Sequence, residues 1–368
     1  MVRAVPGQDH AGRCSVWDAM PLRLTAIERL IFHEGNLGPG PIVDLYGSFA
    51  AKGILVALRL GLFEALASKP LHSEELAQNL GADARGVRLL LELLEALGYV
   101  RAQGSRFRNT ATTTKWLLAK SPTGIADLFE FFEEMQRRWD FLEGALRAGK
   151  PTCRSADWFA AHPGSWDRYH AGLRAVARLG APEIVARVRI PAGARRLLDL
   201  GGSHGCYSIA FCSRHPGLSA IVLDWEQARD VAEKSIAAAG MRERVTFLAG
   251  DLWQDEYPGE CDIVLLFNLV RIFSAERSEV LVRRAVAALK PGGLVVVVDN
   301  QTRLRASRFQ RAVAGVIALE LFNATPGRMH DPAEVARWLV AAGCSRPDTR
   351  LLRHSPGSYL LTARKKPV

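Results

Sequence analysis

Alternating strand-like and helix-like hydrophobic patterns fill the chain from about residue 191 onward. Short runs of continuous apolar residues predict buried strands, and helical spacing between several of them predicts the connecting helices. The predicted strands are 196–200, 220–223, 245–248, 262–267 and 294–298, with helices near 205–214, 226–239 and 276–289. This order is typical of an α/β fold with a doubly wound, mostly parallel sheet, in which a ligand binds beyond the carboxyl ends of the strands.

Residues 41–118 show a different pattern, which is mainly helical and ends in a hairpin. Apolar positions recur at helical spacing over 42–66, and interruptions near Gly53 and Gly61 predict two helices there. Two further helices and two short strands follow in the order typical of a winged helix, at 73–80, 83–97, 99–101 and 106–108.

A winged helix often binds DNA, so its second helix, residues 83–97, has to be tested as a reader of base edges. Such a helix needs several exposed polar side chains, whereas this one carries six leucines and is apolar nearly all round. An all-round apolar helix indicates burial on more than one side, which favours packing against a domain or a second subunit. A winged-helix regulator is kept as the alternative from another functional class.

Residues 119–190 are predicted to be helical and are rich in aromatic side chains. Aromatic residues at helical spacing usually pack the core of a helix bundle, but as a group they would also form the walls of a pocket for a flat organic substrate. The candidate substrate-binding residues are Phe132, Trp139, Trp158 and Tyr169 from this segment, with Phe273 and Asn323 from the later part of the chain.

Composition narrows the class of protein. The 368-residue length and 48% apolar content favour two packed domains and exclude a disordered chain. The net charge of +10 comes mainly from arginines scattered along the chain, so no nucleic-acid partner is expected. The apolar runs are strand-length or interrupted by charges, which predicts no membrane span, and the N-terminus does not resemble a secretory signal, which predicts a cytoplasmic location. Six cysteines without a C-x-x-C pair argue against a metal site.

The turn after the first predicted strand carries the candidate cofactor motif. The dinucleotide fingerprint G-x-G-x-x-G fails here, because Ser203 and Cys206 stand where its second and third glycines would be. The turn instead reads D-x-G-x-x-x-G, with Asp199, Gly201 and Gly205, and is similar to the first motif of class I S-adenosylmethionine-dependent methyltransferases. Glycines in such a loop let the backbone approach the ligand closely.

Acidic residues at the ends of the next two strands extend this motif. Asp224 could accept both ribose hydroxyls, because a carboxylate offers two oxygens to two donors. Asp251 could accept from the adenine amino group, and the two residues after it could cover the ring. The candidate cofactor-binding residues are therefore Asp199, Gly201, Gly202, Gly205, Asp224, Trp225, Asp251, Leu252, Trp253 and Asn268.

From about Pro41 to Lys365 the chain resembles small-molecule O-methyltransferases with an N-terminal winged-helix dimerisation domain, a group that includes caffeate-type, hydroxyindole and bacterial tailoring enzymes. The matching segments are 198–205, 250–253, 290–293 and 334–343. The resemblance implies a homodimer, a small-molecule substrate and S-adenosyl-L-methionine as the cofactor. The domain boundaries expected from it are an arm at 1–40, a dimerisation domain at 41–118, a helical cap at 119–190 and a cofactor-binding domain at 191–368.

The resemblance fails at the family's catalytic base. The family has a histidine with an acidic neighbour after the fourth strand, but Arg271 and Ile272 occupy these positions here, and Gly327 stands where a supporting glutamate is expected before Arg328. An arginine cannot act as a base near neutral pH. Arg271 is therefore interpreted in three ways: an ion-pair residue, a binding residue for an anionic substrate, or the mark of a relative that no longer transfers methyl groups.

Two histidines could replace the missing base, namely His330 after the fifth strand and His170 after the aromatic segment. A lone histidine is more often structural, so Arg271, His330 and His170 all remain candidate catalytic residues. The predicted activity is transfer of the sulfonium methyl group to an oxygen, or to a nitrogen or carbon, of an aromatic or polyene-type metabolite. The alternatives are non-methyl-transfer chemistry on the same cofactor site, or the regulator.

Overall fold

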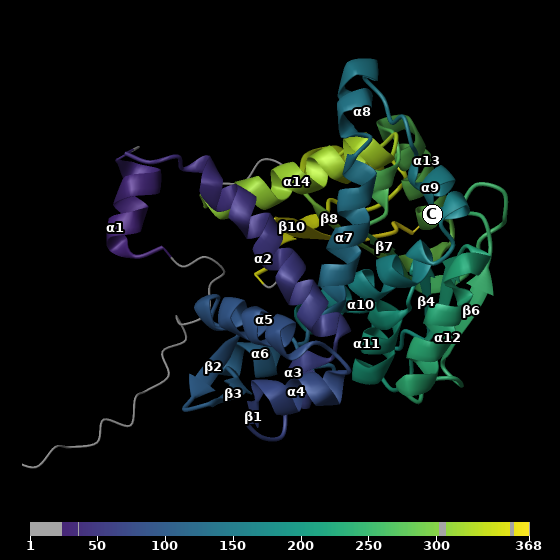
Figure 1. Ribbon diagram of the computed structural model, residues 1–368. Helices are drawn as coiled ribbons and strands as arrows, with labels where there is room; N and C mark the ends of the chain where they lie inside the picture. The colour runs from purple at the N-terminus through teal and green to yellow at the C-terminus, as the bar shows by residue number, and fades with distance from the viewer. Residues whose placement is uncertain (1–23, 36, 302–306, 354–356, 368) are drawn as a thin grey trace, which may run out of the picture. The chain divides into compact units, whose positions relative to one another are not determined.

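The computed structural model describes residues 24–35, 37–301, 307–353 and 357–367, and the chain divides into two compact units after Phe129 (Figure 1). The expected N-terminal arm lies mostly outside the described residues. Its described part holds the short helix α1 (Ala26–Arg29) and a π-helical turn (Leu30–Glu34).

The first unit contains the predicted helix, turn, helix and hairpin. Its elements are α2 (Pro41–Arg59), α3 (Leu62–Ala65), β1 (Leu71–His72), α4 (Ser73–Leu80), α5 (Ala84–Ala96), β2 (Val100–Gln103), β3 (Arg106–Asn109) and α6 (Ala111–Trp116). The three strands form an antiparallel sheet in the order β1-β3-β2. One apolar core joins the helices α2, α3, α4 and α5 to the sheet of this unit.

The predicted helix break at Gly53 is wrong, because α2 runs through that residue without interruption. A Cβ atom at Gly53 would lie 2.9 Å from the Leu93 side chain, so the glycine allows α2 and α5 to pack closely. The break at Gly61 is confirmed: its φ of 72° is in the left-handed region, which glycine adopts without strain.

Helix α2 also carries much exposed apolar surface. Within the part of the chain that the structure describes, it is the one helix long and apolar enough to cross a membrane, a weak criterion that core helices and signal sequences also meet. Its exposed apolar residues include Leu45, Tyr46 and Phe49, and Phe49 is 71% exposed. Surface of this kind in a monomer indicates a covered interface.

The second unit contains the expected α/β sheet, with strand order β6-β5-β4-β7-β8-β10-β9. Five strands are parallel, and β10 and β9 are added antiparallel at one edge. The strands are β4 (Arg196–Leu200), β5 (Ser219–Asp224), β6 (Val245–Ala249), β7 (Cys261–Phe267), β8 (Leu289–Asn300), β9 (Asp348–Leu351) and β10 (Ser358–Arg364). All five predicted strands are thus confirmed as the parallel core.

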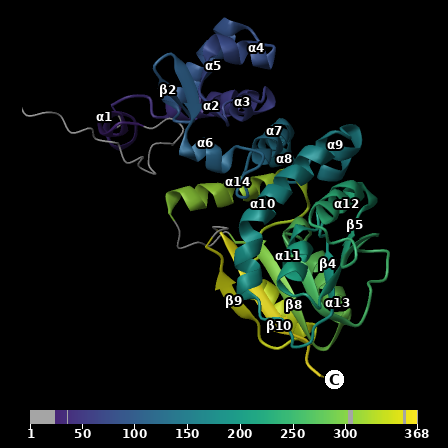
Figure 2. The same ribbon diagram turned by 90° about the horizontal axis from the view of Figure 1, so that it is seen from below.

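Helices pack on both faces of this sheet (Figure 2). One face is covered by α10 (Ser165–Arg187), α11 (Cys206–Arg214) and α12 (Arg229–Ala238), and the other by α13 (Ala275–Ala287) and α15 (Pro332–Ala341). Because β4, β7 and the second half of β8 are buried on both faces, the polar groups that can reach a ligand lie at the strand ends and in the loops there.

The remaining helices are α7 (Asp127–Trp139), α8 (Leu142–Ala148), α9 (Ser155–Ala161) and α14 (Arg308–Ala324). Two buried carboxylates join α7, α9 and α14 to each other and to α10, and α8 contacts α14. Glu134 is 2% exposed and accepts from Trp158 Nε1 at 2.7 Å, Ser165 Oγ at 2.6 Å and Arg168 Nε at 2.8 Å. Burial by itself raises the pKa of Glu134, but these three donors outweigh it and lower the pKa below its usual value.

Glu320 on α14 is the second carboxylate. It accepts from the Arg138 guanidinium and from Trp139 Nε1, the latter at 2.7 Å. Asn323, one turn further along α14, donates from Nδ2 to the backbone oxygen of Arg138 at 2.9 Å. Helices α7 and α14 are therefore connected by a buried ion pair and by two hydrogen bonds.

A glycine on α10 tests the close packing of the helices in the second unit. In Gly172→Ala the new Cβ would lie 2.3 Å from Phe131 Cβ on α7, so we expect the free energy of unfolding to fall by about 1–3 kcal/mol through overpacking. The matched control is Gly315→Ala on α14, where no described heavy atom lies within 4 Å of the new Cβ. This control should raise stability by about 0.5–1 kcal/mol through helix propensity. Equal changes in chemical denaturation would contradict the packing of α10 on α7.

Candidate functional site

The loop from β4 to α11 is shaped by glycines that no other residue could replace. Gly201 and Gly205 have φ values of 65° and 68°. A Cβ atom at Gly202 would lie 2.6 Å from the Asp199 carboxylate carbon, and one at Gly201 would lie 2.7 Å from Leu269. The packing beneath the loop therefore leaves no room for a side chain at Gly201 or Gly202.

Asp199 lies under this loop with its carboxylate almost fully buried. The Ser208 hydroxyl donates to its Oδ2 at 2.8 Å, and its Oδ1 has no partner among the described residues. Burial, with a smaller contribution from the nearby Asp224 charge, raises the pKa of Asp199 to about 7. A buried carboxylate with one unpartnered oxygen suits a cationic ligand group.

Asp224 ends β5 beside the same loop. Its Oδ2 accepts from the backbone N–H of Ser203 at 2.8 Å, and its Oδ1 accepts from that of Trp225 at 2.7 Å. Burial raises the pKa of Asp224 against these two bonds. Each oxygen keeps a further lone pair, so the carboxylate can still accept from two donors. A hollow of about 530 Å³ opens here, lined by Trp225, Glu226, Gln227, Ala249 and Gly250.

The turn after β6 is held by its own side chains. Asp251 accepts from the backbone N–H of Trp253 at 2.6 Å, and Leu252 is buried. The Trp253 ring meets the Phe273 ring edge-on at 4.9 Å between centroids, and the Arg277 guanidinium lies 4.1 Å from its centre. Two residues that the sequence assigned to different ligands, Trp253 and Phe273, therefore pack on each other.

Asn268 follows β7 with a φ of 54°, in the left-handed region. Its N–H donates to the backbone oxygen of Val298 at 2.7 Å, and its side chain is among the groups that act on the pKa of Tyr207 on α11. The Asn268 side chain therefore lies near the start of α11, the helix that the glycine-rich loop leads into, because Tyr207 is the second residue of that helix.

Arg271 is engaged by a buried acid from the neighbouring strand β8. Its Nη1 lies 3.4 Å from Asp299 Oδ1 and also donates to Asn300 Oδ1, and its backbone N–H donates to Asp299 Oδ2 at 3.2 Å. Burial raises the pKa of Asp299, and the Arg271 charge opposes that rise. The structure supplies a partner for one of the three interpretations of Arg271, the ion pair, because Asp299 lies beside it. Asp299 also neutralises the positive charge that would bind an anionic substrate.

The absence of a glutamate at position 327 also has a packing reason. A Cβ atom at Gly327 would lie 2.0 Å from the backbone oxygen of Arg271 and 2.7 Å from the backbone nitrogen of Phe273. The chain therefore passes directly over residues 271–273, where only glycine fits.

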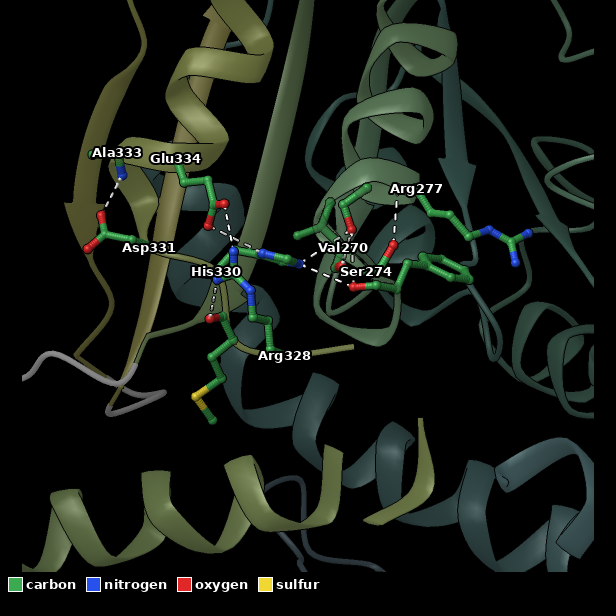
Figure 3. Close-up of polar contacts among 11 residues, drawn as sticks. Val270, Ser274, Arg277, Arg328, His330, Asp331, Ala333 and Glu334 are labelled. Atoms are coloured by element: carbon green, nitrogen blue, oxygen red, sulfur yellow. Dashed lines mark hydrogen bonds and ion pairs between the residues drawn. The ribbon is translucent and has the colours of Figure 1, made fainter. Parts of the chain in front are cut away.

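His330 is packed on every side (Figure 3). Its Nε2 lies 3.3 Å from the backbone oxygen of Phe273 and 3.4 Å from Ser278 Oγ, while its Nδ1 lies 3.4 Å from Glu334 Oε2. The ring meets Trp338 edge-on at 4.9 Å between centroids, and the residue is 1% exposed. These contacts attach α15 to the segment before α13.

His170 is placed differently, since it lies against the glycine-rich loop. Its Nδ1 is 2.7 Å from Ser203 Oγ, and its Nε2 has no partner within the described ranges of the chain. Burial lowers the pKa of His170 to about 4, so the ring is neutral at physiological pH.

The candidate substrate residues do not form one cluster. The indole nitrogens of Trp139 and Trp158 and the amide nitrogen of Asn323 donate to internal partners, and Phe132 is 48% exposed. The buried Oδ1 of Asn323 has no hydrogen-bond partner among the described residues. Tyr169 does lie near the loop: it is next to His170, and the charges that act on its pKa include Arg271 and Asp224. Sequence reasoning missed four residues of this region, Ser203, Glu134, Glu320 and Asp299. Glu320 and Asp299 each follow an apolar run, which is a signal, whereas the neighbours of Ser203 and Glu134 give none.

Comparison with known proteins adds to this geometry. Residues 157–345 match the O-methyltransferase domain family, and residues 44–120 match the O-methyltransferase dimerisation domain family. The chain is 30% identical over 330 residues to 3-hydroxy-5-methyl-1-naphthoate 3-O-methyltransferase of Streptomyces sahachiroi, covering 87% of this chain and 93% of the relative.

A second relative is the tetracenomycin polyketide synthesis 8-O-methyl transferase TcmO of Streptomyces glaucescens. It is 27% identical, and the match covers 88% of this chain and 99% of that protein. The structure of human N-acetylserotonin methyltransferase in complex with SAM superposes with a TM-score of 0.77 at 21% identity, over 95% of this chain and all of that one, which is a likeness of fold.

The Arg271–Asp299 pair predicts a specific effect on stability. Arg271→Ala leaves the Asp299 carboxylate buried without its cation, so we expect a loss of about 3–5 kcal/mol in the free energy of unfolding. Adding Asp299→Asn in the same chain should recover most of this loss, because the second change removes the uncompensated charge. The control is Arg242→Ala, at an exposed arginine, which should leave stability unchanged. Denaturation that shows no recovery in the double variant would contradict the pairing.

Proposed function

This chain belongs to the O-methyltransferase family and depends on S-adenosylmethionine, and from that premise we propose that it methylates a hydroxyl oxygen of a small aromatic or polyketide metabolite as a homodimer. The observation that carries the proposal is the pair of carboxylates on either side of the glycine-rich loop, the buried Asp199 and the half-buried Asp224, with added Cβ atoms at Gly201 and Gly202 excluded by the packing. The acceptor class is supported by the two bacterial relatives, whose names describe a naphthoate and a polyketide.

The residues around the loop fit this cofactor. The unpartnered Oδ1 of Asp199 would receive a cationic group of the methionine portion, and the bare backbone at Gly201 and Gly202 would let that portion approach. Asp224 would accept from the ribose hydroxyls, and the hollow beside Trp225 would receive the adenine ring. The bound cofactor supplies a sulfonium methyl group that is already an activated electrophile.

The residues of the chain then mainly orient the acceptor and exclude water. Correct orientation of two reactants is worth several kcal/mol, on the order of 7–11 in favourable cases, even without a base. Arg271 is bound to Asp299 and is no base, and the His330 ring is 1% exposed between α13 and α15, so it offers almost no surface to an acceptor. We therefore expect an acceptor that is ionised near neutral pH, such as a phenol made acidic by a conjugated carbonyl group.

The homodimer is proposed from the first unit. The apolar side chains on α2 are exposed in the single chain, and an apolar groove of about 290 Å³ beside them is lined by Val56, Leu60, Ala82, Asp83, Gly86, Val87 and Leu90. The match to a dimerisation domain over residues 44–120 supports a second copy as the partner that covers this surface.

Sedimentation tests this assembly directly. The wild type should sediment as a dimer, and Phe49→Glu should shift it toward a monomer, because the change places a charge on the exposed apolar side of α2. Leu351→Glu, at an apolar residue of the second unit that is 58% exposed, is the control and should stay dimeric. A monomeric wild type would refute the homodimer, and sequence-selective DNA binding that survives about 150 mM salt would favour a regulator instead.

Cofactor binding and product formation test the activity together. Asp224→Ala should weaken S-adenosylmethionine binding in calorimetry by more than about tenfold, because two charge-assisted hydrogen bonds are lost. Asp230→Ala, an exposed acid on the following helix, should leave the affinity unchanged. Wild-type protein incubated with methyl-labelled cofactor and a metabolite extract should give a product heavier by one methyl group on oxygen. Tight binding without any methylated product would favour the non-methylating alternative, and unchanged affinity in Asp224→Ala would refute the site.

A further inference from the structure

One residue of the glycine-rich loop has a conformation that its side chain disfavours. Ser203 has a φ of 44°, in the left-handed region, where a residue with a Cβ atom is strained. The other described residues of this kind are Glu260 and Asn268, and neither lies within the loop. A strained backbone persists only where its surroundings determine it, so the contacts of Ser203 need an explanation.

Two hydrogen bonds hold Ser203 in this conformation. Its backbone N–H donates to Asp224 Oδ2 at 2.8 Å, which turns the amide toward the end of β5. Its Oγ shares a hydrogen bond of 2.7 Å with His170 Nδ1 on α10. The serine therefore connects the carboxylate proposed to bind the ribose with a helix that begins 38 residues earlier in the chain.

His170 is itself fixed in place. Its ring is stacked on that of Trp166 at 5.2 Å between centroids with an angle of 12°, and the residue is 5% exposed. The neighbouring His204 also lies near α10, since the backbone of Leu173 on that helix is among the groups that act on its pKa, and its Nδ1 accepts from the N–H of Cys206 at 3.0 Å. The Ser203–His170 hydrogen bond is thus the contact that attaches the loop to α10.

We propose that His170 is a positioning residue that acts through Ser203: by bonding the Ser203 hydroxyl it holds the loop in the conformation in which Asp224 can bind the cofactor. This inference rests on the proposed function, because it concerns the affinity of the same cofactor site. It makes α10 part of the cofactor site, although no residue of α10 needs to touch the cofactor. Movement of α10 would change the affinity for S-adenosylmethionine.

Substitutions at His170 can separate its two ring nitrogens. The amide of asparagine reaches the place of Nδ1, whereas the longer glutamine places its amide near Nε2. We therefore expect His170→Asn to retain wild-type affinity for S-adenosylmethionine in calorimetry. His170→Gln and His170→Ala should weaken it about three- to tenfold, the effect of one lost hydrogen bond. His215→Asn, at a histidine that ends α11 away from this contact, is the matched control and should bind normally.

Ser203→Gly provides the second arm, because glycine adopts a left-handed conformation without help. This variant should bind S-adenosylmethionine nearly as well as the wild type, and adding His170→Ala to it should cause no further loss. The proposal is overturned if His170→Ala binds as the wild type does, or if its effect is equally large in the Ser203→Gly background. It is also overturned if His170→Asn keeps the affinity but loses kcat, since the imidazole would then act on the acceptor.

The melting temperature of each variant shows whether it is folded. A variant that does not fold is replaced by Ser203→Ala, which removes the hydrogen bond between Ser203 and His170 by deleting the serine hydroxyl. The wild-type titration separates the two proposals. A wild type that does not bind S-adenosylmethionine refutes the proposed function, whereas a wild type that binds, with all His170 variants equal to it, refutes only the role of His170.

Discussion

The close passage of the Gly201–Gly202 backbone over Asp199, Val222 and Leu269 is the constraint on which the site depends. A single Cβ atom at either glycine would collide with a side chain from β4, β5 or the turn after β7. Because the loop is pressed onto the sheet, Asp199 is sealed beneath it and the Ser203 amide reaches Asp224. The same contact therefore sets the burial of one carboxylate and the orientation of the other.

Four buried carboxylates lie where elements of the second unit pack against each other. Asp199 is left with one free oxygen, whereas Glu134, Glu320 and Asp299 each have several internal donors or a cation. An unpaired buried charge is costly, so a group that remains unsatisfied in the folded chain is a place where a ligand can supply the missing partner. This contrast separates Asp199, the group proposed to bind the cofactor, from the carboxylates that hold other elements together.

The sequence was sufficient for the fold class and for the family, and insufficient for the contacts between distant residues. Continuous apolar strands and the D-x-G-x-x-x-G loop are local patterns, so they can be recognised within a few residues. The bonds from Glu320 to Arg138 and from Asp299 to Arg271 join residues 182 and 28 positions apart, and no local pattern announces them. Gly53 failed as a helix break for the same reason, because its purpose is contact with Leu93 on another helix.

The arginine at position 271 has a physical context in the fold. An arginine there is useful only with a buried acid to neutralise it, and Asp299 provides this acid on the adjacent strand. The nearby histidines His170 and His204 are kept neutral, since burial lowers their pKa values to about 4 and about 3. Such rings exchange no protons near neutral pH and serve instead as fixed hydrogen-bonding groups. On the proposed function, a site with this composition would orient its reactants and leave ionisation to the acceptor, which would favour substrates that are already acidic.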